Sequence, residues 1–122
     1  MRILTTRELK IMRENGADFT LVNVLPEEYY RKEHIPGSRN VPVTEDDFVR
    51  RIEEIVPDKS RTVVVYCACR ECTASSTAAG KLDQAGFTDV RDYETGVRGW
   101  RGAGLPLRSV PEDRLSLVGG TC

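Results

Sequence analysis

The chain has 122 residues, of which 39% are hydrophobic and 30% are charged. This length suits one domain, and a formal net charge of -1 gives no electrostatic reason to expect binding to nucleic acid or to an anionic membrane. No apolar run approaches the roughly 20 residues of a membrane-spanning helix, and the N-terminus lacks the apolar core of a signal peptide, so a cytoplasmic protein with reduced thiols is expected.

Short apolar runs alternate with segments of helical spacing along most of the chain. Runs rich in β-branched residues predict strands at residues 1–4, 20–24, 62–66 and 88–92, with a short extended piece around 40–42. Helical spacing and capping signals predict helices at residues 6–15, 44–55, 74–85 and 96–100, and Pro26 opens a further short helix. Strands that alternate with helices favour an α/β fold with a mainly parallel sheet covered on both faces.

Two features refine this outline. Thr44 is predicted to cap the helix that follows it, and the run at residues 62–66 is the most apolar strand and therefore the expected centre of the sheet. We expect residues 1–108 to form one domain and residues 109–122 to form a C-terminal tail.

The cysteines are clustered, which argues against a disulfide framework. Three of the four, Cys67, Cys69 and Cys72, lie within six residues, and the fourth, Cys122, ends the chain. Cys67 directly follows the most apolar strand and precedes a helix. This arrangement places its sulfur at the carboxyl edge of a parallel sheet, near helical N–H groups that favour an anion.

Several segments together resemble a known family, the single-domain rhodaneses, which are sulfurtransferases. They appear in the family's order, with Cys67 at the place of the catalytic cysteine. The segments are residues 21–24, 27–30, 34–42, 63–67, 78–90 and 96–106. The resemblance implies a rhodanese-like α/β fold with a five-stranded, mainly parallel sheet flanked by helices.

The resemblance also implies a mechanism. Cys67 would take a sulfane sulfur from a donor such as thiosulfate, hold it as a persulfide, and pass it to cyanide or to a thiol, including a protein thiol. No cofactor and no metal are implied. A thiol's pKa, about 8.5 when unperturbed, falls near helix N-termini, so we expect backbone N–H groups of the loop to form an anion cradle.

The predicted substrate-binding loop is Ala68, Cys69, Arg70, Glu71, Cys72 and Thr73. Arg70 is a candidate for holding an anionic donor, and Arg98 is a second cation expected near the thiolate. Cys72 and Cys69 are candidate resolving thiols that would take the sulfur from a Cys67 persulfide; the alternative is that they are incidental loop cysteines. Thr73 and Ser75 are candidate caps of the following helix.

The sequence departs from the family's pattern in four places. Asn23 and Leu25 stand where the family commonly has Asp and Arg, and Thr95 precedes Gly96 where it has Gly-Gly. The loop lacks the family's glycine and final arginine, and it is about two residues longer than in short-loop members. Counting back from Gly86 would therefore make Cys69 the catalytic residue. We prefer Cys67, because the strand-to-loop junction fixes where its sulfur points.

Other functions remain as alternatives. The cysteine trio could bind a soft metal, with Cys122 or His34 as the fourth ligand. A rhodanese-like phosphatase would need an arginine that closes the loop, and none follows. A non-catalytic sulfur-carrier or regulatory binding module would need only the persulfide. His34, the only histidine, is expected to be a structural residue in a turn rather than a catalytic base.

Overall fold

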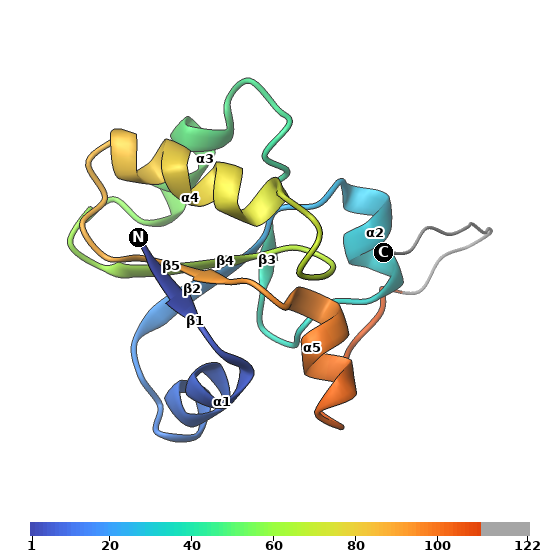
Figure 1. The fold of residues 1–122 in the computed structure, drawn as a ribbon. Coiled ribbons are helices and arrows are strands. Elements are labelled where there is room, and N and C mark those ends of the chain that lie inside the picture. The colour runs from blue at the N-terminus through green and yellow to red at the C-terminus, as the bar shows by residue number, and fades with distance from the viewer. Residues whose placement is uncertain (111–122) are drawn as a thin grey trace.

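The computed structural model describes residues 1–110, so nearly all of the predicted tail lies outside the described residues. Five strands and five helices alternate along the chain (Figure 1). In chain order they are β1 (Arg2–Leu4), α1 (Thr6–Glu14), β2 (Phe19–Asn23), α2 (Glu27–Lys32), β3 (Arg39–Asn40), α3 (Phe48–Ile55), β4 (Thr62–Tyr66), α4 (Ala74–Gln84), β5 (Val90–Tyr93) and α5 (Gly96–Gly102).

The five strands form one all-parallel sheet in the order β1-β5-β4-β2-β3. The predicted α/β fold with a five-stranded parallel sheet is confirmed. Strand β4 lies between β5 and β2, as its composition predicts, and its residues from Val63 to Tyr66 have no solvent exposure. The carboxyl end of this buried strand is where Cys67 begins the next loop.

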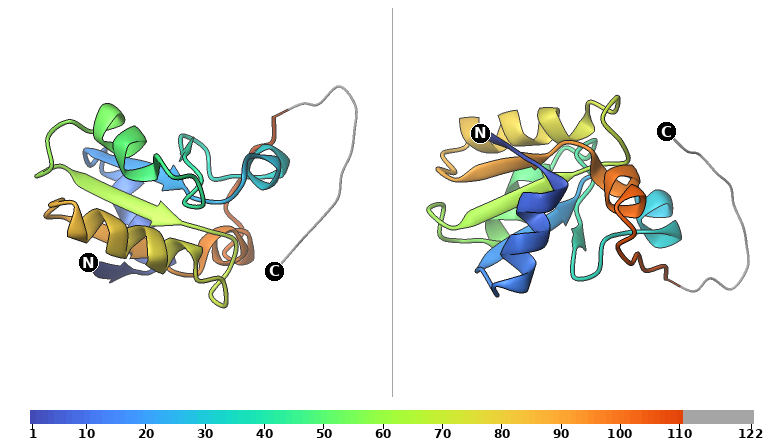
Figure 2. Two further views of the ribbon diagram at one scale, coloured as in Figure 1. Left: turned by 90° about the horizontal axis from the view of Figure 1, so that it is seen from above. Right: turned by 60° about the horizontal axis from the view of Figure 1, so that its bottom comes forward.

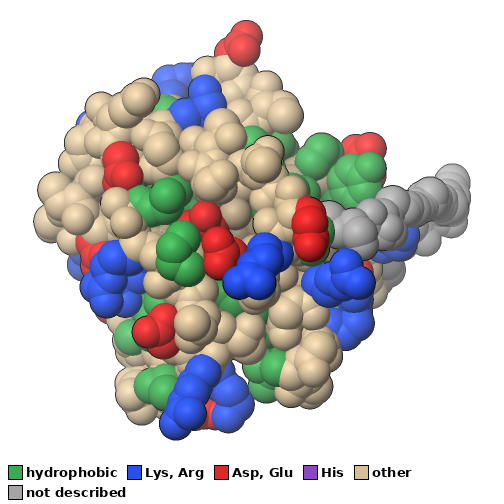
Figure 3. All heavy atoms as spheres, viewed as in Figure 1, with side chains coloured by type: hydrophobic (Ala, Val, Ile, Leu, Met, Phe, Trp, Pro, Cys, Tyr) green, Lys and Arg blue, Asp and Glu red, His purple; other side chains and the backbone are tan. Residues whose placement is uncertain are grey.

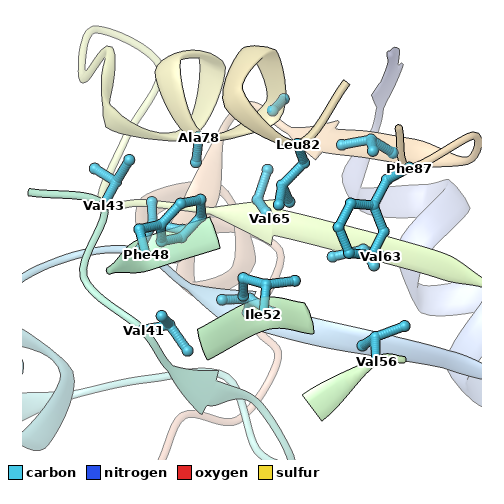
Figure 4. Close-up of a cluster of buried hydrophobic side chains, with 14 of the residues drawn as sticks. Val41, Val43, Phe48, Ile52, Val56, Val63, Val65, Ala78, Leu82 and Phe87 are labelled. Atoms are coloured by element: carbon cyan, nitrogen blue, oxygen red, sulfur yellow. The ribbon is translucent and has the colours of Figure 1, made fainter. Parts of the chain in front are cut away.

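Helices cover both faces of the sheet. α3 and α4 lie on one face, and α1 and α5 lie on the other (Figures 1 and 2). Because side chains alternate along a strand, Val63 and Val65 pack under α3 and α4, whereas Val64 and Tyr66 pack toward α1 and α5. Figure 4 shows the first of these two cores, to which Phe48 of α3 and Val65 of β4 both belong.

The start of α3 differs from the sequence prediction. The helix begins at Phe48, with Asp47 at its N-cap, whereas Thr44 lies in a turn. The backbone N–H of Val43 donates to the carbonyl of Val24 at 3.1 Å, which holds this segment beside the end of β2. The chain must then turn away from the sheet before it can wind, so the predicted Thr44 cap is wrong.

Tyr66 links the central strand to the turn at residues 34–38. Its buried hydroxyl accepts a hydrogen bond from the N–H of Ile35 at 3.0 Å. The Ser38 hydroxyl donates to the Ile35 carbonyl at 2.7 Å, so in its 2.7 Å contact with Ser38 the Tyr66 hydroxyl is the donor. Burial raises the pKa of Tyr66, which keeps the hydroxyl protonated for this role.

The surface carries charges of both signs. On the face shown in Figure 3, basic and acidic side chains are interspersed rather than gathered by sign, in keeping with the small net charge. Among the described residues, no helix combines the length and the apolar character required to cross a bilayer.

We expect Tyr66→Phe to lower the free energy of unfolding by about 1–3 kcal/mol, because it leaves the buried N–H of Ile35 without its acceptor. Chemical denaturation followed by circular dichroism measures this loss. Tyr29→Phe is the matched control, because Tyr29 is an exposed side chain, and it should change stability little. Equal stabilities for the two variants would contradict the bracing role of Tyr66.

Candidate active site

Cys67 lies directly after β4, and residues 67–73 form a loop that leads into α4. The sulfur therefore sits at the carboxyl edge of the sheet, beside the N-terminus of an 11-residue helix, as the sequence predicts. Cys69, the alternative position for the catalytic thiol, lies two residues further on within a bend. The strand end thus positions Cys67 directly and reaches Cys69 only through the loop.

The start of α5 holds the loop in place. The backbone N–H of Val97 donates to the carbonyl of Cys67 at 3.0 Å, and that of Arg98 donates to the carbonyl of Ala68 at 2.8 Å. Gly96 makes this approach possible, because a Cβ atom there would lie 2.1 Å from the Cys67 carbonyl oxygen. Its φ of +59° also lies in the region that favours glycine.

The Cys67 sulfur is enclosed. The residue has no solvent exposure, and its Sγ lies 3.8 Å from the carbonyl oxygen of Cys69 and 3.6 Å from that of Cys72. These oxygens accept hydrogen bonds, so the resting group is a thiol donor. The N–H cradle expected from Ala68 to Thr73 stays a prediction for the anionic form.

The acidity of Cys67 also differs from the expectation. Burial, together with a hydrogen bond to the Cys72 side chain, raises the pKa of the Cys67 thiol to about 11. Hydrogen bonds from the Ser75 hydroxyl and backbone N–H act in the opposite direction. The predicted stabilisation by the N-terminus of α4 is therefore present at Ser75, but removal of the sulfur from water outweighs it.

The rest of the loop makes a tight turn. The N–H of Cys72 donates to the carbonyl of Cys69 at 3.2 Å, which brings the chain back toward Cys67. Cys69 is buried, whereas Cys72 is half-buried. Thr73 occupies the N-cap of α4, yet its side chain makes no capping hydrogen bond. Thr73 therefore lies at the predicted cap position but does not cap the helix with its side chain.

The two cationic candidates lie at the surface. The Arg70 side chain is 69% exposed, and its Nη2 lies 3.6 Å from Oε1 of Glu94. Glu71 is exposed beside it. Arg98 contributes its backbone N–H to the loop, and the residue itself is exposed. An exposed ion pair of this kind leaves Arg70 available to an incoming anion at little cost.

Asp92 is a site residue that the sequence analysis did not identify. It lies on β5 opposite Val65, and the residue is only 3% exposed. Burial raises the pKa of its carboxyl, a hydrogen bond with Ser75 acts against this, and nearby Glu94 adds to the rise. No described residue hydrogen-bonds to its Oδ1 atom. The sequence did hold a signal for Asp92, because it is an acidic residue within a predicted strand.

At the end of β2, Asn23 and Leu25 stand at the two positions where the resembling family commonly has Asp and Arg. Oδ1 of the fully buried Asn23 accepts from the N–H of Leu25 at 3.0 Å, and Asn40 donates to the Leu25 carbonyl at 2.8 Å. This loop is therefore held by neutral amide hydrogen bonds that involve its own backbone.

His34 has the structural role that the sequence predicts. Its Nδ1 donates to the carbonyl of Tyr30 at 2.8 Å, and the two rings stack with centroids 3.9 Å apart. Its backbone exchanges two 2.8 Å hydrogen bonds with Arg108.

No group of three or more His, Cys, Asp or Glu side chains within residues 1–110 is arranged to hold a metal ion. Cys122, the other fourth ligand considered for a metal site, lies outside the described residues.

Comparisons with known proteins agree with this architecture. Residues 5–103 match the family described as "Rhodanese-like domain". The chain is 38% identical over 104 residues to the HTH-type transcriptional regulator Rv0324 of Mycobacterium tuberculosis, covering 85% of this chain and 43% of the regulator. It is 39% identical over 72 residues to the thiosulfate sulfurtransferase PspE of Escherichia coli, covering 58% of this chain and 64% of that protein. The chain thus spans less than two-thirds of either relative.

The fold also matches a solved structure of a thiosulfate sulfurtransferase from Pseudomonas aeruginosa. The TM-score is 0.81 at 28% identity, and the match covers 98% of this chain and 22% of that one.

Gly96→Ala should lower the free energy of unfolding by about 3 kcal/mol, because it adds a steric clash with the Cys67 carbonyl to an unfavourable positive φ. Two control variants separate these effects in the same denaturation experiment. Gly104→Ala has a positive φ but open space, so it should cost about 1–2 kcal/mol. Gly80→Ala lies in open space within α4 and should be neutral or stabilising by up to about 1 kcal/mol. A Gly96→Ala cost no larger than that of Gly104→Ala would refute the close approach.

Alkylation with iodoacetamide should modify Cys72 before Cys67 at pH 7. Cys67 is fully buried, and a thiol with a pKa of about 11 is ionised to the extent of only about one molecule in ten thousand at this pH. Because the pKa is raised, the thiolate fraction and the Cys67 rate should keep rising as the pH approaches 11. Peptide mass spectrometry after timed alkylation measures both rates. A Cys67 rate that levels off near pH 8 would contradict the assignment.

Proposed function

The chain belongs to the rhodanese-like domain family, and from this we propose that it is a sulfurtransferase that carries a sulfane sulfur as a persulfide on Cys67. The observation that carries the proposal is the placement of the Cys67 sulfur at the end of the central strand, beside the start of α4, where Ser75 lowers the pKa of the thiol. The similarity of 72 residues to a thiosulfate sulfurtransferase supports the same reaction class.

The proposed first step is attack on an anionic sulfur donor, with thiosulfate as the simplest case. The Cys67 thiolate forms a bond to the outer sulfur of the donor, the donor's S–S bond breaks, and sulfite leaves with the electron pair. The thiol proton is lost to solvent. Arg70, whose exposed side chain forms a surface ion pair with Glu94, is the proposed first contact for the donor's negative charge.

Two hydrogen-bond donors are proposed to stabilise the anion that forms on sulfur. The Ser75 hydroxyl and backbone N–H both lower the pKa of the thiol, so they are the donors proposed to act on the anion. The loop N–H groups from Ala68 to Thr73 would join them if the loop reorients as Cys67 ionises. Because burial holds the resting thiol protonated, we expect donor binding and ionisation to be coupled.

The second step is transfer to an acceptor. A thiolate or cyanide attacks the outer sulfur of the persulfide and regenerates the Cys67 thiolate. Because Cys67 has no exposed surface, the loop must open before an external acceptor can reach it. A protein thiol that displaces the loop is as suitable chemically as a small thiol.

A sulfur-carrier or regulatory module is the second candidate function. Two observations favour it over an efficient enzyme. Burial raises the pKa of the Cys67 thiol to about 11, which limits spontaneous ionisation. In addition, 85% of the chain is similar to part of a protein named as a transcriptional regulator. Such a module would form the persulfide once and hold it.

Phosphatase chemistry is less well supported. It requires a guanidinium fork over the nucleophile, and the loop's one arginine, Arg70, is 69% exposed and paired with Glu94.

Treatment with thiosulfate, followed by removal of the donor and intact-mass measurement, should add the mass of one sulfur atom to the wild-type protein, with the added sulfur on Cys67 at early times. Cys67→Ser should show no gain. Cys122→Ser is the control variant, because it replaces a cysteine outside the loop, and it should load like the wild type. A mass gain that persists in Cys67→Ser would place the first sulfur on another cysteine and overturn the assignment. Cyanide turnover separates the enzyme from the carrier: the enzyme produces thiocyanate repeatedly, whereas the carrier does so at most once.

A further inference from the structure

We propose that Cys72 is the resolving thiol of this site. It attacks the Sγ atom of a Cys67 persulfide, forms a Cys67–Cys72 disulfide and releases the carried sulfur as hydrosulfide. This second activity rests on the proposed function, because it needs the persulfide as its substrate.

The turn of the loop brings the two cysteines together. The 3.2 Å hydrogen bond from the N–H of Cys72 to the carbonyl of Cys69 closes a tight turn. As a result, Cys72 returns to the sulfur five residues before it in sequence, and its carbonyl oxygen lies 3.6 Å from Sγ of Cys67. The Cys72 side chain also acts on the Cys67 thiol, because it is one of the causes that raise the pKa of that thiol. Both residues are free thiols.

The two sulfurs differ in their access to solvent. Cys67 belongs to the buried core and has no exposure, whereas Cys72 is half-buried and packs against that core from outside. An external acceptor cannot reach the buried sulfur while the loop is closed. Cys72 is already in contact with it, so an internal reaction requires no such opening.

The neighbouring Cys69 is less suitable for this role. Its contact with the Cys67 sulfur is through its backbone carbonyl oxygen, at 3.8 Å. Cys69 is disulfide-bonded, so it offers no free thiol, and the residue is only 2% exposed. The contacts therefore select Cys72 from the two cysteines that the sequence leaves as resolving candidates.

The step balances without an added oxidant. The Cys72 thiolate forms a bond to Sγ of Cys67, the bond between Sγ and the outer sulfur breaks, and the outer sulfur leaves as hydrosulfide with the electron pair. The sulfane sulfur is reduced, and the two cysteine thiols are oxidised to a disulfide. An external dithiol then reduces this disulfide, attacking first at the accessible Cys72 sulfur, and restores both thiols.

Attack on Sγ rather than on the outer sulfur follows from two observations. The contact in the resting site is between Cys72 and Cys67 itself, and the outer sulfur would extend one bond further away. In addition, attack on the outer sulfur would expel the Cys67 thiolate, which is a poor leaving group because burial raises the pKa of its thiol. Hydrosulfide, the anion of a more acidic group, leaves more readily.

The test follows thiosulfate-loaded protein after the donor has been removed, with no reductant present. Hydrosulfide is measured with a fluorogenic probe, and the cysteine peptides are mapped by mass spectrometry without reduction. The wild type should release about one equivalent of hydrosulfide and lose the added sulfur mass as a Cys67–Cys72 linked peptide appears. Cys72→Ser and Cys72→Ala should instead retain the Cys67 persulfide, with hydrosulfide release at least about tenfold slower. Cys122→Ser, the matched cysteine-to-serine control, should behave as the wild type does.

The other outcomes overturn the proposal at different points. A wild-type persulfide as long-lived as that of the Cys72 variants would exclude resolution by Cys72 while leaving the proposed function intact. Movement of the sulfur onto Cys72 as a persulfide, without hydrosulfide release, would exclude the disulfide step. If neither the wild type nor the Cys72 variants gains sulfur from thiosulfate, the proposed thiosulfate-dependent function fails and this inference fails with it.

Discussion

Two hydrogen bonds at the start of α5 are the constraint on which the candidate site depends. The first N–H groups of a helix have no partner within it, and here those of Val97 and Arg98 find theirs in the carbonyls of Cys67 and Ala68. They connect the segment after β5 to the segment after β4, so the loop leaves the sheet in a fixed direction. The contact is possible only because Gly96 has no side chain. The absence of a side chain at Gly96 therefore fixes where the sulfur of Cys67 lies.

The same packing produces an electrostatic conflict. The contacts that enclose the Cys67 sulfur also remove it from water, and burial then favours the neutral thiol over the thiolate that attacks a donor. Ser75 opposes this effect at the thiol, and it also lowers the pKa of the buried carboxyl of Asp92. Ser75 therefore acts on both buried acidic groups of the site, the thiol and the carboxyl.

The sequence predicts the parts of this protein that depend on local chemistry. The buried run of Val63 to Val65 and the alternation of strands with helices are sufficient for the sheet, its central strand and the position of Cys67. The start of α3 was misplaced, because the hydrogen bond between Val43 and Val24 is a tertiary contact that overrides the local signal of Thr44. The acidity of Cys67 was misjudged for a related reason: helix position is visible in a sequence, whereas complete burial is not. Asp92 was missed because its importance arises from strand register.

The enclosure of Cys67 has a kinetic consequence. A nucleophile with no exposed surface reacts with outside molecules only during the brief intervals when its loop is displaced, a local fluctuation rather than global unfolding. Such a reaction is conformationally gated. At low acceptor concentration the rate rises in proportion to concentration, and at high concentration it reaches a ceiling set by the frequency of loop opening. Different acceptors would then share one maximal rate, so selectivity among them would be expressed mainly at low concentration.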